Sequence, residues 1–186
     1  MVSFNCIGNM SNTFEVLETV TWAIDDKILT RDPYLKFATF DGDRFQGGLI
    51  NHDQLSMSLG YKIYYSGAWG AVLEQTGLPH SHVENVPLRV GWNFIGHAPL
   101  HTIPIAEIAP IESHGFSPDD QFKTRAGNTV WVTTFSGAGW QGDLTELTPG
   151  IGYEVKVSKA ITFCYACGTS LSPPPLGASK ASIYHS

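Results

Sequence analysis

Short runs in which apolar and polar residues alternate dominate this chain, and Gly, Pro, Asp or Asn residues bound most of them. Such period-two runs predict β-strands. The predicted strands cover residues 2–7, 35–40, 61–65, 90–95, 129–135 and 153–157, and the last is followed by a further strand-like run to residue 165. Two segments instead have helical spacing: one begins at Asn12, and a shorter one begins at Thr102 with Pro104 in its first turn. The pattern predicts a mainly β fold, of the β-rich α+β class.

This pattern occurs twice along the chain, in the same order and with similar spacing. The matched motifs are Phe4-Asn5-Cys6-Ile7-Gly8 with Trp92-Asn93-Phe94-Ile95-Gly96, Asp26-x-Ile28-x-Thr30-Arg31 with Asp120-x-Phe122-x-Thr124-Arg125, Phe40-x-Gly42-x-x-Phe45-Gln46-Gly47 with Phe135-x-Gly137-x-x-Trp140-Gln141-Gly142, and Leu55-x-x-x-Leu59-Gly60-Tyr61 with Leu147-x-x-x-Ile151-Gly152-Tyr153. Ser66 also aligns with Ser158. The repeat is too long for a solenoid or propeller unit. We therefore expect two similar β-sheet units with one short helix each, related by internal duplication as a pseudo-twofold pair.

The repeat divides the chain into four parts. Residues 1–74 form the first β-rich repeat, 75–89 a polar linker, 90–167 the second repeat and 168–186 a Pro-containing C-terminal arm. In the arm, Pro173, Pro174 and Pro175 predict a polyproline-like spacer, and Ile183 and Tyr184 an adhesive tip. The arm is either a frayed tail or a self-assembly arm that docks on a neighbouring subunit.

Composition narrows the function classes. The chain is 42% apolar and only 15% charged, with a net charge of −6, and low surface charge favours contact with other proteins. No run of Lys and Arg occurs along the sequence, so we expect no nucleic-acid partner. No apolar run has the ~20 residues that span a bilayer. The first residues lead directly into the first repeat, so we expect no targeting peptide within this chain.

Few residues offer chemistry. Cys164 and Cys167 have metal or redox spacing, but zinc needs four ligands and no second pair lies at a suitable distance, which favours a structural role. His97 and His101, and likewise His80 and His82, fit solvent-facing loops better than a metal site. No nucleophile elbow, P-loop or dinucleotide fingerprint occurs. We expect no catalytic residue, no cofactor and no metal.

Charged and aromatic residues that recur or lie near turns admit two interpretations. Asp26 with Arg31, and Asp120 with Arg125, occupy the same positions in both repeats, and a local ion pair or a turn cap explains them more simply than catalysis. Asp41 and Asp43 could bind calcium, although no EF-hand loop follows. Aromatic residues such as Trp69, Trp140 and Tyr64 could stack on sugar rings, or could belong to the core.

The motif Gly91-Trp92-Asn93-Phe94-Ile95-Gly96, closed by Leu147 to Tyr153, resembles a β-rich repeat of bacterial surface proteins. The duplicated arrangement from Phe4 to Tyr165 also resembles the pyrenoid shell (PyShell) proteins of diatoms. That resemblance implies a chloroplast protein at the pyrenoid periphery, which tiles into a sheet around the Rubisco-filled compartment and has Rubisco or other pyrenoid proteins as further partners.

The leading hypothesis from the sequence is a non-enzymatic structural protein. Two similar units in one chain offer two similar surfaces, and contacts that repeat without closing a ring build extended assemblies. Its main partner would be itself, in a sheet or tube. The alternative is a carbohydrate-binding or adhesive cell-surface module.

Overall fold

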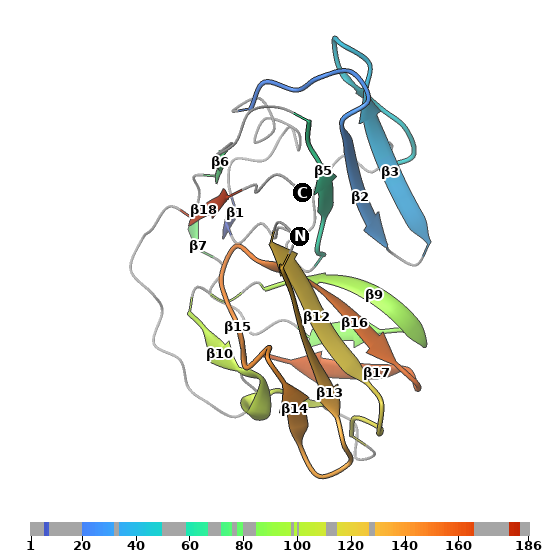
Figure 1. Cartoon of the computed structure of the whole chain (residues 1–186), viewed down its shortest axis with the longest axis vertical. Helices are drawn as coiled ribbons and strands as arrows, with labels where there is room; N and C mark the ends of the chain where they lie inside the picture. The colour runs from blue at the N-terminus through green and yellow to red at the C-terminus, as the bar shows by residue number, and fades with distance from the viewer. Residues whose placement is uncertain are drawn as a thin grey trace.

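The structure is a computed structural model, and it describes residues 6–7, 20–31, 34–49, 59–66, 72–75, 78–79, 85–97, 99, 101–110, 115–126, 129–165 and 179–182. Its sheets are antiparallel, and its largest ones have four and five strands. The prediction of a mainly β chain is confirmed. Figure 1 shows the two large sheets toward opposite ends of the longest axis.

The first unit is built on the four-stranded sheet, which has the order β4-β3-β2-β5. Its strands are β2 (Lys27–Arg31), β3 (Leu35–Phe40), β4 (Phe45–Gln46) and β5 (Lys62–Tyr64). The second unit is built on the five-stranded sheet, β14-β13-β12-β16-β9. Its strands are β9 (Gly91–Gly96), β12 (Gln121–Ala126), β13 (Thr129–Phe135), β14 (Trp140–Gly142) and β16 (Gly152–Val157).

Four strands of each sheet share one order and one register. Ile28 lies opposite Ala38 and Ile63 in the first sheet, as Phe122 lies opposite Thr133 and Val155 in the second. Each hairpin closes with an aromatic pair, Phe40 with Phe45 and Phe135 with Trp140. The ring centroids are 5.3 Å and 5.2 Å apart, as expected for cross-strand aromatic packing.

A buried carboxylate holds the same turn in each unit. Asp26 accepts hydrogen bonds from the backbone N–H groups of Ala23 and Ser66, each at 2.9 Å. Asp120 accepts the equivalent bonds from Ser117 and Ser158, each at 2.8 Å. The preceding residues, Asp25 and Asp119, have φ of 73° and 70°, a conformation that Asp tolerates better than most residues. The recurrent aspartates are therefore turn caps.

The matched threonines and glycines are also explained by contacts within each unit. The Thr30 hydroxyl donates to the Gly60 carbonyl, and the Thr124 hydroxyl donates to the Gly152 carbonyl, both at 2.8 Å. Gly47 and Gly142 have φ of 135° and 147°, and a Cβ there would lie 2.5 Å and 2.1 Å from the carbonyl oxygens of the neighbouring strand. Only glycine fits such a close approach.

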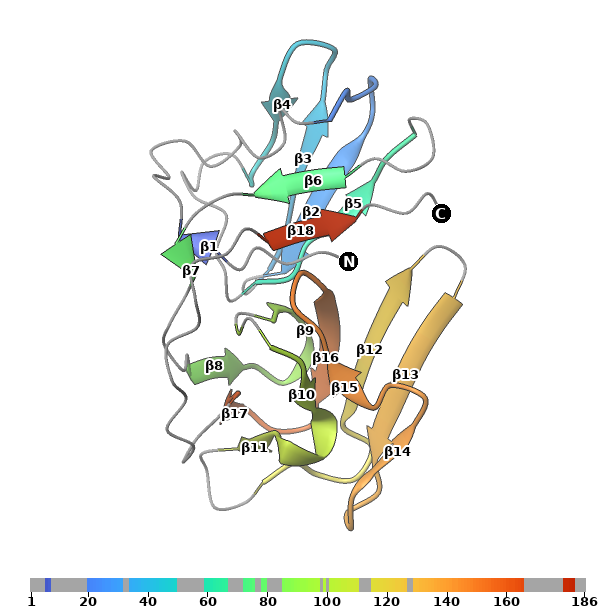
Figure 2. The ribbon, with the colours of Figure 1, turned by 90° about the vertical axis from the view of Figure 1, so that its left-hand side faces the viewer.

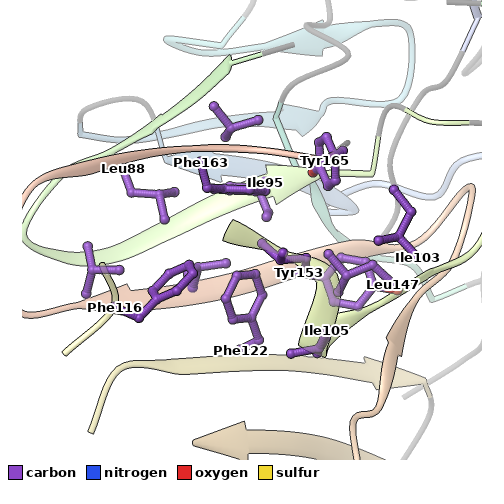
Figure 3. Packing of buried hydrophobic residues seen from close by; sticks show 14 of the residues in the cluster. Leu88, Ile95, Ile103, Ile105, Phe116, Phe122, Leu147, Tyr153, Phe163 and Tyr165 are labelled. Atoms are coloured by element: carbon purple, nitrogen blue, oxygen red, sulfur yellow. The ribbon is translucent and has the colours of Figure 1, made fainter. Parts of the chain in front are cut away.

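Each unit has its own hydrophobic core. The smaller cluster is formed by Val20, Ile28, Ala38, Phe45, Leu49 and Tyr61. The larger one lies between the five-stranded sheet and a second layer, and Figure 3 shows Phe122 and Tyr153 from the sheet facing Phe163 and Leu88 from that layer. The second layer is the sheet β11-β17-β8, made of Ala109–Pro110, Ile161–Cys164 and Asn85–Leu88. Val86 and Leu88, near the end of the predicted linker, thus belong to the core of the second unit.

Helical structure is scarcer than predicted. The segment after Thr102 forms strand β10 (Ile103–Pro104) and then η2, a 3-10 helix of three residues, Ile105–Glu107. Pairing of β10 with β15 (Glu146–Leu147) takes up the residues that would have begun an α-helix. Ile105 and Ile108 are buried, as predicted. The helix predicted after Asn12 lies outside the described residues, apart from Val20 near its end.

Two short strand pairs complete the described part of the chain. Strand β1 (Cys6–Ile7), a piece of the first predicted strand, pairs with β7 (Leu78–Pro79). Strand β6 (Val72–Gln75) pairs with β18 (Ser179–Ser182), so part of the predicted arm lies against its own chain. Figure 2 shows β6 and β18 side by side near the first unit. Among the described residues, no helix is long and apolar enough to cross a bilayer.

Candidate assembly surface

Strand alternation gives each large sheet one face turned toward its core and one turned away from it, which we call the outer face. The outer faces carry exposed large apolar side chains at matching positions. Leu35 and Phe37 on β3 are each 50% exposed. Val130 and Val132, their counterparts on β13 by strand register, are 43% and 38% exposed. Tyr64 adds a 53% exposed ring from β5.

Basic residues gather on the same outer faces. The set consists of Lys27, Arg31 and Lys62 in the first sheet and Lys123, Arg125 and Lys156 in the second, which is six of the chain's 11 Lys and Arg residues. Among the described strand residues of these faces, Glu154 is the one acidic residue. The sequence showed no basic run because alternation places these residues two apart along the strands, and pairing then brings the strands together. The fold therefore brings together basic residues that form no run along the sequence.

The two outer faces meet at β9. Leu59, just before β5, forms an isolated antiparallel bridge with Ile95 on the edge of β9. The neighbouring Phe94 is buried, and Lys62 from the first unit lies 4.9 Å from its ring centroid. The guanidinium of Arg31 lies 5.9 Å from the same centroid. Cations of one unit therefore cover an aromatic ring of the other, an arrangement favoured by cation–π attraction.

Glu154 is the electrostatic centre of this junction. Its carboxylate lies 2.6 Å from Lys62 Nζ in the first unit and 3.0 Å from Lys123 Nζ in its own sheet. Burial, the largest single influence, raises the pKa of Glu154. The hydrogen bonds and charges of the two lysines outweigh it and hold the pKa below the usual value. The carboxylate therefore stays ionised and joins the two units.

Lys62 and Glu154 occupy the same place in the two sheets. Each directly follows the matched tyrosine, Tyr61 or Tyr153, and each lies opposite the third residue of the central strand. The two units thus carry opposite charges at one equivalent position, and these charges pair with each other. If the first units of two copies met in the same way, Lys62 would face Lys62, and if two second units did, Glu154 would face Glu154. Both contacts would bring like charges together.

The predicted site residues are only partly described. Pro173, Pro174, Pro175, Ile183 and Tyr184 lie outside the described residues, so docking of the arm on a neighbour stays a prediction. Trp69 also lies outside them. Tyr64 is exposed on the outer face, whereas Trp140 packs edge-on against Phe122 in the core, with the ring centroids 5.1 Å apart.

The residues with metal or redox spacing have structural surroundings. Cys164 is buried and disulfide-bonded, and its partner is not among the described side chains. His97 is fully buried rather than solvent-facing, which corrects the loop interpretation. Its Nε2 lies 2.7 Å from the His101 carbonyl oxygen, which can only accept, so Nε2 carries the proton. Among the described residues, no three His, Cys, Asp or Glu side chains are grouped to hold a metal ion.

Sequence reasoning missed this surface because it depends on strands that were not predicted. The central strands β2 and β12 carry four of its six basic residues. The alternation in Lys-Ile-Leu-Thr-Arg and Gln-Phe-Lys-Thr-Arg was the available signal, but both runs are short and rich in charged or polar residues. Comparisons of the chain with protein-family models, with curated proteins and with solved structures gave no match.

Proposed function

We propose that this protein is a non-enzymatic structural protein that assembles with itself, through its outer faces, into a sheet or shell. The observation that carries the proposal is the pair of exposed apolar side chains found at the same two positions of both sheets, Leu35 and Phe37 in one and Val130 and Val132 in the other. Large apolar side chains that lie exposed and close together are typical of protein–protein contact sites.

Two similar units in one chain allow such contacts to continue from one subunit to the next. The shared strand order, the shared register and the paired turn caps support an origin by internal duplication, in a pseudo-twofold arrangement. A chain with two adhesive faces can contact two neighbours, and contacts that do not close a ring continue indefinitely. The resemblance to diatom pyrenoid shell proteins makes a shell around a Rubisco-containing pyrenoid the setting that we propose, with the chloroplast as the compartment.

Electron microscopy of the purified protein across a concentration series tests the proposal. We expect regular sheets or tubes above a threshold concentration. Replacing the apolar pairs, as Leu35→Thr with Phe37→Thr and Val130→Thr with Val132→Thr, should abolish these assemblies, since threonine keeps β propensity but removes apolar area. Unchanged thermal unfolding would show that the variants still fold. Dispersed monomers of the native chain at every concentration would refute the proposal.

The alternative function is carbohydrate binding. Tyr64, at 53% exposed, and Tyr34, at 79%, both belong to the first unit and could stack on sugar rings. Retention on a glycan array that is lost in the Tyr64→Ala variant would favour this function. Trp140 is partly buried and packs against Phe122, which weakens one of the aromatic residues on which this alternative depended.

A further inference from the structure

We infer that the outer face of one copy binds the opposite, acidic side of a second copy, so that the subunits stack front to back. This inference rests on the proposed function and names the surface that each subunit contacts. The general basis is that surfaces of opposite charge attract and suppress wrong pairings.

The charges of the chain are divided unevenly over its surface. Six basic residues and Glu154 lie on the outer faces. Elsewhere on the described surface, the exposed charged residues are seven acidic ones, Asp25, Asp41, Asp43, Glu107, Asp119, Asp143 and Glu146, and three basic ones, Arg44, Arg89 and Lys159. An acidic protein therefore presents a basic, apolar face. The basic outer face of one copy repels the outer face of a second copy and attracts the acidic part of that copy's surface.

The acidic counterpart lies on the elements that cover the inner face of the five-stranded sheet. We call residues 103–107 and 143–147, which include β10, η2 and β15, the back layer. Its apolar side chains Ile103, Ile105 and Leu147 belong to the core of the second unit. Its exposed charged residues are Glu107, Asp143 and Glu146, and it contains no Lys or Arg.

Hydrogen bonding holds the back layer together as one surface. The backbone N–H of Ile105 donates to the Thr145 carbonyl at 2.9 Å, and Pro104 lies opposite Glu146 in the strand pair. Because the basic face and the back layer lie on opposite sides of the same sheet, contact between them is heterologous. A heterologous contact leaves one free face of each kind at the ends, so the stack grows without closing unless its rotation happens to form a ring.

Complementary charge reversals test this inference. The front variant carries Lys27→Glu and Lys156→Glu, which avoids the three residues bonded at the Glu154 junction. The back variant carries Glu107→Lys and Glu146→Lys. Each variant alone should need at least about tenfold more protein to assemble, because its two contacting surfaces now repel. An equal mixture should assemble near the native threshold, since each altered surface meets its complement in the other variant.

A matched control is Arg89→Glu with Lys159→Glu, which changes the net charge as much as the front variant but lies in loops off the outer face. It should assemble like the native chain. Recovery in the mixture supports front-to-back stacking. If the front variant assembles like the native chain, or if the mixture fails although both variants fold, the inference is wrong while the proposed function stands. If the native chain itself never assembles, the proposed function fails.

Discussion

The two units share one scaffold but differ in how their sheets are completed. The second unit has β9 as a fifth strand, a covering layer and a large aromatic core, whereas the described part of the first has four strands and six buried apolar residues. The first unit, through Leu59 and Lys62, lies against the free edge of β9. Among the described residues, the second unit therefore has the larger core, and the first unit supplies the contacts at the edge of β9.

The substitution expected to destabilise the sheets most replaces the glycine at which two strands approach each other most closely. Gly142→Ala should lower the free energy of unfolding by about 4 kcal/mol, since its Cβ would lie 2.1 Å from the Val132 carbonyl oxygen. Gly47→Ala, with 2.5 Å to the Phe37 oxygen, should cost somewhat less. Urea denaturation measures both. Gly139→Ala and Gly48→Ala meet no atom within 4 Å and serve as controls that should change stability by less than about 1 kcal/mol.

Acid should weaken the second unit through His97. Burial lowers the pKa of His97 from 6.5 to about 4, so the unfolded chain takes up a proton before the folded chain does. The contribution of neutral His97 to the free energy of unfolding is fully present above pH 6.5. It declines between pH 6.5 and about 4, and below that range the free energy of unfolding is lower by up to about 3 kcal/mol. Denaturation at several pH values measures the decline. In His97→Gln, which keeps a donor for the His101 carbonyl, this part of the pH dependence should vanish; an unaltered profile would contradict the assignment.

Removing either capping aspartate should destabilise the protein by a similar amount, whereas removing the matched serine hydroxyls should have different effects in the two units. Asp26→Ala and Asp120→Ala should each cost about 2 kcal/mol, because two backbone N–H groups lose their acceptor. Asp26 also accepts a bond from the Ser66 hydroxyl at 2.8 Å, whereas the matched Ser158 donates to Asp120 through its backbone N–H. Ser66→Ala should therefore cost about 1 kcal/mol and Ser158→Ala close to none. Equal effects in thermal unfolding would argue against this difference.

The junction offers the mildest test. Lys62→Glu should cost about 1 kcal/mol by setting two carboxylates against each other, and Glu154→Lys should cost a similar amount. The double exchange should recover part of the loss, because the pair is restored but Lys123 then faces a lysine. A double-mutant cycle measures this coupling. Strictly additive losses would mean that the 2.6 Å contact contributes nothing to joining the units.

The sequence predicted the strands whose apolar pattern is strong and missed those that depend on their neighbours. Strands β3 and β13 were predicted to the residue, as were the two aromatic hairpins, because alternation and Gly-containing turns act locally. Strands β8, β10 and β15 are two to four residues long and exist only through tertiary pairing. Burial of His97 was missed because its neighbours, such as Tyr165, are distant in sequence.

The candidate surface was predictable only in part. The structural role of the matched aspartates followed from the sequence, whereas the sequence left open whether Tyr64 is exposed or belongs to the core. The basic face did not follow from the sequence, because its members come from β2, β5, β12 and β16 and meet only when those strands pair in the right register. The hydrogen bonds also explain why Ser66 and Ser158 align: both donate to the aspartate cap from the end of the last sheet strand.

The pairing of β6 with β18 has a consequence for the order of folding. Because Gln75 lies opposite Ser179, these two short strands close a loop of about 100 residues that contains the whole second unit. Bringing such distant ends together is entropically unfavourable until the intervening chain is compact. The second unit must therefore be largely formed before β18 finds β6. Among the described strand pairs, this one should form last during synthesis, and in mild denaturant it should be among the first to open.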